Sequence, residues 1–184
     1  MRRTRRPQIP QRRRVFVGCE GESERGYIVR LGQLLDERGC HVHLDPVLLR
    51  GGDPLSLLRR AEKGIRRGER RGAYEIRAAL LDHDRVGQSP TRDSDIDALA
   101  SKLRLTIIWQ RPCHEALLLR HLPDCAALLP GTTEDAGRRL AQCWPGYSKP
   151  MSARDLRSQI DMDAVERARK VESELDAFLK LLGW

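Results

Sequence analysis

Two aspartates one residue apart, Asp82 and Asp84, are the residues most clearly arranged for chemistry. They follow an apolar segment, residues 74–81, that predicts a buried strand. Because side chains alternate along an extended chain, both carboxylates would lie on one side of it. Two close carboxylates repel each other unless a cation lies between them or one is protonated, so the pair suits a hard divalent ion such as Mg²⁺. A strand end followed by an ordinary aspartate turn is the alternative explanation.

Strands that alternate with helices are expected to position these aspartates. Apolar and β-branched runs predict strands at residues 14–19, 41–44, 74–81 and 103–109. Apolar residues at helical spacing predict helices near residues 23–38, 54–71, 94–102, 116–122 and 133–143, with one or two more within 152–182. This order predicts an α/β fold, with a mostly parallel central sheet of about four strands, helices on both faces and a C-terminal helical extension.

Four acidic side chains follow strand ends in this scheme. Glu20 follows the first predicted strand, Asp82 and Asp84 follow the third, and Glu115 follows the fourth after a short loop. The carboxyl ends of parallel strands meet at one edge of a sheet, where functional groups gather. We therefore expect these four carboxylates to converge and treat them as the candidate catalytic residues.

Glu24 lies one helical turn beyond Glu20 and is a candidate ligand for a second ion. The alternative is structural, because an acidic residue in the first turn favours the positive N-terminal end of a helix. Ser23 is expected to cap that helix, and Asp53 is expected to cap the helix that starts at Pro54.

The net charge of +8 is concentrated at the start of the chain. Residues 1–14 contain no acid and carry the arginines Arg2, Arg3, Arg5, Arg6, Arg12, Arg13 and Arg14. Such an arm attracts polyphosphate by counterion release, although a solubilising tail has the same composition. A second basic stretch lies on the outer face of the helix predicted after Pro54, where it suits either phosphate or solvent.

Composition narrows the class of protein further. The chain has 184 residues, enough for one domain with a proper core. No apolar run is long enough to cross a membrane and no apolar leader is visible, so we expect a cytoplasmic protein. The five cysteines include no CxxC pair, which predicts reduced thiols. We expect a basic arm at 1–13, a main domain at 14–150, and a helical extension at 151–184 packed on that domain.

Several segments resemble known families. A glutamate after the first strand and a D-x-D after a later strand resemble the Toprim arrangement of topoisomerases and primases. More closely, residues 17–24 (VGCEGESE), 81–85 (LDHDR) and 111–119 (RPCHEALLL) are similar to the CEG-x-[ST]-E, D-x-D and NPCFE-x-W-LL motifs of the RloB-like family. These are restriction-linked proteins with a Toprim-like core. Residues 147–149 (YSK) resemble the Tyr-x-Lys element of that family, so the resemblance covers about residues 15–150.

The sequence departs from the family pattern around Glu115. Arg111 stands where asparagine is usual, and His114 stands where phenylalanine is usual. Ala116 and Leu117 replace a Leu-Trp pair. The role of Glu115 is therefore the part of the site that the resemblance defines least.

The resemblance implies a Toprim-like fold and a metal-dependent nuclease, or a related phosphotransferase, that acts in defence against phage. Its substrate would be RNA, including tRNA, or DNA, and its partner an ATPase encoded nearby. The sequence leaves the oligomeric state open. The alternative is a non-catalytic nucleic-acid-binding or regulatory subunit of a defence complex.

In the catalytic reading, Mg²⁺, or Mn²⁺ in its place, would be held by Glu20, Asp82 and Asp84. It would offset charge on the phosphate and orient a water. Glu20 is alternatively a general acid or base. Lys149 or Arg85 would hold the scissile phosphate, unless each is an ordinary surface charge.

Overall fold

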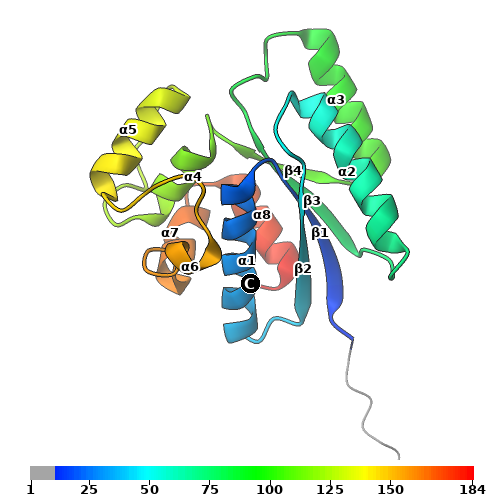
Figure 1. Ribbon diagram of the computed structural model, residues 1–184, viewed down its shortest axis with the longest axis horizontal. Helices are drawn as coiled ribbons and strands as arrows, with labels where there is room; N and C mark the ends of the chain where they lie inside the picture. The colour runs from blue at the N-terminus through cyan, green and yellow to red at the C-terminus, as the bar shows by residue number, and fades with distance from the viewer. Residues whose placement is uncertain (1–10) are drawn as a thin grey trace, which may run out of the picture.

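The computed structural model of the protein describes residues 11–184 and has a four-stranded, all-parallel sheet at its centre (Figure 1). The strands are β1 (Arg13–Cys19), β2 (Val42–Leu48), β3 (Ile76–Asp82) and β4 (Thr106–Gln110), and their order across the sheet is β2-β1-β3-β4. The predicted α/β fold is confirmed. Among the strands, the largest differences from the predicted bounds are in β2, which runs on past residue 44, and in β4, which starts three residues later; the other strand bounds differ by two residues or fewer. Residues 1–10, which hold four of the arginines of the predicted arm, lie outside the described part.

Helices cover both faces of the sheet (Figure 1). One face carries α2 (Pro54–Glu69) and α3 (Pro90–Leu103), and the other carries α1 (Glu22–Glu37) and α8 (Ser173–Leu182). On the same side as α1 lie α4 (His114–His121), α6 (Ala153–Leu156) and α7 (Met162–Arg169), and α5 (Thr133–Cys143) packs on α4 farther from the sheet. The C-terminal stretch thus holds three helices where one or two were predicted. Within residues 11–184, none of the helices is long and apolar enough to cross a membrane.

Side chains of β1 alternate between two hydrophobic cores, as the pleat of a strand requires. Val15 and Val17 are fully buried in the larger core, beneath α1 and the C-terminal helices. Phe16 points the other way, into the smaller core beneath α2 and α3. A strand with both faces buried reads as a continuous apolar run, which is why this segment was recognisable in the sequence.

The C-terminal helices share the core of the sheet. Phe178 and Leu182 of α8 are fully buried in the same cluster as Val15 of β1. Residues 151–184 therefore pack on the domain through apolar side chains, although the expected domain boundary itself stays a prediction.

Candidate active site

The carboxyl ends of all four strands lie at one edge of the sheet, because every strand pair is parallel. Just beyond this edge is an open pocket of about 490 Å³, which we call the acidic pocket. Four acidic residues line it: Glu20, Glu24 and Asp82, and Glu22, which pairs with Arg25 at 3.2 Å. Its wall also contains Gly21, Ser23, Leu48, Arg50, Gly51, His114, Lys149 and Pro150. Segments far apart in the sequence thus contribute to one site.

Backbone hydrogen bonds fix two of these carboxylates in place. Glu20 Oε2 accepts a hydrogen bond from the backbone N–H of Asp82, at 3.1 Å, and so joins the end of β1 to the end of β3. Glu24 Oε2 accepts from the backbone N–H of Gly21, at 3.0 Å, and closes the first turn of α1. Glu24 therefore has the structural role that was one of its two predicted roles, and it also faces the pocket. The predicted cap was wrong, because the N-cap is Gly21 and the Ser23 hydroxyl instead accepts from the N–H of Met151.

The electrostatics of the pocket oppose the charged form of its acids. Burial and the neighbouring charges of Glu20 and Glu24 raise the pKa of Asp82 to about 8. Burial also raises the pKa of Glu20, with Glu24 adding to the effect. Asp82 Oδ1 is buried and has no hydrogen-bond partner among the described residues. An unpaired, buried carboxylate oxygen beside two other carboxylates is a position where a cation would be stabilised.

Asp84 lies apart from this group. The β3 strand ends at Asp82, and Asp84 falls in the exposed turn that follows, so the expectation that the strand would present both aspartates on one side was wrong. The charge of Asp84 nevertheless acts on the pocket, since it adds to the raised pKa of both Glu20 and Asp82. No three acidic, histidine or cysteine side chains between residues 11 and 184 stand close enough to hold one metal ion as placed. The predicted ligand set of Glu20, Asp82 and Asp84 stays a prediction.

Glu115 is buried beside the pocket and is paired. Its Oε1 accepts a hydrogen bond from the Tyr147 hydroxyl at 2.7 Å and forms an ion pair with Lys149. Burial alone would raise the pKa of Glu115, but Lys149, Tyr147 and Cys113 outweigh it and lower the pKa to about 2. Glu115 is therefore an ionised carboxylate held by partners. Its other oxygen, Oε2, is buried and has no hydrogen-bond partner among the described residues.

The sequence profile of the RloB-like proteins matches residues 15–178, which is most of the chain. The chain belongs to the RloB-like protein family. The match begins in β1 and ends in α8, so it includes the strand ends, the acidic pocket and the helices that support them. No curated protein and no solved structure matches the chain.

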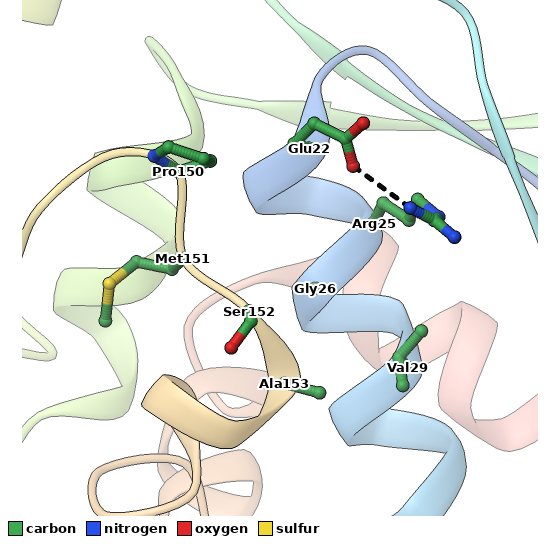
Figure 2. Close-up of a pocket in the computed structure, with 8 residues that line it drawn as sticks. All are labelled: Glu22, Arg25, Gly26, Val29, Pro150, Met151, Ser152 and Ala153. Atoms are coloured by element: carbon green, nitrogen blue, oxygen red, sulfur yellow. Dashed lines mark hydrogen bonds and ion pairs between the residues drawn. The ribbon is translucent and has the colours of Figure 1, made fainter.

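Lys149 of this RloB-like protein is positioned by a close approach between two segments. The chain from Pro150 to Ala153 runs beside α1, and a small pocket of about 310 Å³ opens between them (Figure 2). Gly26 faces this segment, and a Cβ at Gly26 would collide with the carbonyl oxygen of Met151. Glycine is therefore required here for packing, and it allows the chain that carries Lys149 to lie against the helix that carries Glu24.

We expect Gly26→Ala to destabilise the protein by about 1–3 kcal/mol, although alanine favours a helix over glycine by about 1 kcal/mol. The added methyl group would push residues 150–152 away from α1. Gly32→Ala in the same helix is the control, because its Cβ would meet nothing closer than Leu44 Cδ1 at 3.9 Å. Urea unfolding of both variants tests this, and equal stability for the two would contradict the packing argument.

The arginines at the start of β1 lie at the amino end of the sheet, opposite the acidic pocket. Arg12 pairs with Asp36 at 2.7 Å, and Arg13 donates to the backbone carbonyl of Leu182 at 3.1 Å. Arg14 pairs with Asp45 at 3.3 Å. All three guanidinium groups therefore have partners within the protein, and their predicted contact with nucleic acid stays a prediction.

Arg85 is exposed, and its charge partly offsets the raised pKa of Glu20, which places it near the pocket. Lys149 lines the pocket as expected, but its ammonium is paired with Glu115. The predicted phosphate-binding role of either residue stays open.

Two residues of the site were missed from the sequence. His114 is fully buried, lines the acidic pocket and leaves Nε2 without a hydrogen-bond partner among the described residues. Its replacement of the usual phenylalanine was the available signal. Arg50 brings a cation to the pocket wall from the turn after β2, and only the structure shows that this turn reaches the site.

Proposed function

We propose that this RloB-like protein is a metal-dependent nuclease that hydrolyses a phosphodiester bond at the acidic pocket. The observation that carries the proposal is the unpaired Oδ1 of Asp82, buried next to Glu20 and Glu24. Repulsion between neighbouring carboxylates is costly unless a cation offsets it, and carboxylate oxygens are the ligands that Mg²⁺ prefers. The donor set therefore fits Mg²⁺, and Mn²⁺ also binds such oxygen ligands.

Within this proposal, the side chains of Glu20, Asp82 and Glu24 move together to hold the ion, since as placed they are too far apart to share it, and Asp84 adds negative charge from the following turn. The bound ion would offset charge on the scissile phosphate and lower the pKa of a water. The alternative role of Glu20 is that of general base, with Asp82 and Glu24 holding the ion without it; burial and its acidic neighbours raise its pKa, which favours proton uptake. Lys149 and Arg50 place positive charge on the pocket wall, where a phosphate enters.

A role in defence against phage, RNA or DNA as the substrate, and an ATPase partner are part of the same proposal. They are supported by membership of a restriction-linked family and by the basic character of the chain. We propose a single strand as the form that enters this pocket of about 490 Å³.

Metal dependence is the first test. Labelled RNA, tRNA, and single- and double-stranded DNA should be cleaved in Mg²⁺ or Mn²⁺ and left intact in EDTA. Because metal binding must displace protons from carboxylates with raised pKa values, Mg²⁺ should stabilise the protein more at about pH 8 than at about pH 6. A concentration ten times the Kd should raise Tm by roughly 3–6 °C.

The result that would refute the proposal is equally direct. An identical Tm with and without Mg²⁺ or Mn²⁺ at about pH 8, together with no cleavage of any nucleic acid, would leave the pocket without a metal function.

A further inference from the structure

A basic surface adjoins the acidic pocket. It is a groove between β2, an edge strand of the sheet, and α2, and it consists of two adjoining hollows of about 330 and 320 Å³. Both hollows are lined by Val47, Leu48, Gly64 and Arg67. We call the two together the basic groove.

The floor of the basic groove is apolar and its rim is cationic. Val47 and Leu48 of β2 form the floor, and Gly64 lets α2 lie close to it, since a Cβ there would be 3.2 Å from Val47 Cγ1. The cations along the rim are Arg25, Arg50, Arg60, Lys63, Arg67 and Arg71. Among residues 11–184, no acidic side chain lines either hollow.

The groove and the acidic pocket share two lining residues. Leu48 and Arg50 line both the pocket and the first hollow, so the two depressions share a wall. Without cations nearby, Glu20, Glu24 and Asp82 would repel a polyanion. Cations beside the pocket offset that repulsion and hold the polyanion close to the acids.

The cations of the rim are not equivalent. Arg60 is committed to the fold, because Nη1 donates to the backbone carbonyls of Leu49, at 2.7 Å, and Arg50, at 3.1 Å. In contrast, Lys63 and Arg67 are exposed, and within residues 11–184 neither has an acidic partner within 4.0 Å. They are one turn apart on α2 and face the same groove.

We propose that the basic groove binds the sugar–phosphate backbone of a single nucleic-acid strand and guides it into the acidic pocket. The identity of the ligand rests on the proposed nuclease function. Lys63 and Arg67 pair with consecutive phosphates, and the apolar floor receives sugars and base faces, as in other single-strand channels. Arg50 stands at the entrance to the pocket and makes the next phosphate contact.

The test compares two double variants that lose the same charge. Lys63→Gln/Arg67→Gln alters the groove, and Arg154→Gln/Arg157→Gln alters two exposed arginines at α6. Glutamine is a good helix former, so both variants should fold, which circular dichroism and Tm verify. Fluorescence anisotropy with labelled single-stranded RNA and DNA, in EDTA to prevent cleavage, gives Kd across a salt series.

The groove variant should bind about 10-fold more weakly, and the slope of log K against log salt should fall by about 1.4, because each single-strand phosphate contact contributes about 0.7. The α6 variant should show a clearly smaller loss of affinity and a clearly smaller change in the salt slope. Equal losses in the two variants would overturn the groove, while nucleic-acid binding itself would stand. Polyglutamate is the competing ligand. If it binds the wild-type protein as tightly as the oligonucleotides do, and the groove variant binds it equally more weakly, the nucleic-acid assignment of the groove is overturned in favour of an acidic protein partner.

The outcomes separate this inference from the proposed function. A wild-type protein that binds no oligonucleotide at any salt overturns both. A wild-type protein that binds through the groove but never cleaves in Mg²⁺ or Mn²⁺ confirms the groove and refutes the nuclease.

Discussion

Replacing Asp82 with asparagine should abolish metal-dependent cleavage and, at about pH 8, stabilise the folded protein. The stability effect follows from the pKa of Asp82, which rises from 3.8 to about 8 on folding. Between these values the folded protein holds a proton that the unfolded chain releases, so wild-type stability falls as the pH rises from about 4 to about 8. Asparagine does not ionise, so the variant does not lose this stability as the pH rises. Its amide can also donate hydrogen bonds to the carboxylates of Glu20 and Glu24.

The expected gain is about 1–3 kcal/mol at about pH 8, since water in the open pocket screens part of the repulsion. Cleavage should fall by at least about 100-fold, because even residues that only support a metal ligand have effects of 10- to 100-fold. Asp95→Asn, an exposed aspartate on α3, is the control and should change neither property. Urea unfolding across pH and cleavage in Mg²⁺ measure the two effects. A variant that is less stable at about pH 8 yet fully active would show that Asp82 is a structural residue.

Strand polarity made much of the site predictable. Glu20 and Asp82 each end or follow a buried apolar run, and parallel pairing brings such ends together whatever their separation in sequence. The same rule accounts for Arg12 to Arg14, which lie at the amino end of β1 and therefore at the opposite edge. Their charge indicated an affinity for polyphosphate but not a location.

The position of Asp84 depends on a contact that the sequence does not reveal. Pairing between β3 and β4 ends where Asp82 meets Gln110. The backbone N–H of His83 then donates to the carbonyls of Gln110 and Pro112, each at 3.0 Å, and the chain turns away. The alternation of side chains within a D-x-D motif does not show at which residue its strand stops pairing with the neighbouring strand.

The basic groove also depends on tertiary structure. The arginine-rich face of α2 was visible in the sequence, and solvent or phosphate explained it equally well. Only the packing of α2 beside the edge strand β2 shows that Lys63 and Arg67 border a hollow that shares Leu48 and Arg50 with the acidic pocket. A charged face of a helix indicates a function only when the fold shows which site lies next to it.

Lys149 has two candidate roles, which the structure makes separable. It was predicted to hold a phosphate, yet its ammonium is paired with Glu115, whose side chain is only 3% exposed. The Tyr147 hydroxyl is the other partner of that carboxylate. If Lys149 acts chiefly on Glu115, its loss should reduce stability; if it acts chiefly on phosphate, its loss should reduce cleavage.

Lys149→Met should destabilise the protein by about 1–3 kcal/mol at about pH 7, because it leaves the buried carboxylate of Glu115 without its cation, while water at the exposed ammonium of Lys149 screens part of the pair. Methionine keeps the apolar stem of lysine, so lost packing contributes little. Adding Glu115→Gln should recover most of the loss, since a neutral amide needs no cation. Lys170→Met, at an exposed lysine without an acidic partner among residues 11–184, should stay within about 0.5 kcal/mol of wild type.

The pH dependence supplies an independent check on this pair. The pKa of Glu115 is lowered to about 2, so the stability that the pair contributes is present above about pH 4.5 and is lost as the pH falls through about 2. The difference between wild type and Lys149→Met, measured by urea unfolding, should therefore shrink as the solution is acidified. A difference that is absent at pH 7, accompanied by a large drop in cleavage, would instead assign Lys149 to the phosphate and leave Tyr147 as the main partner of Glu115.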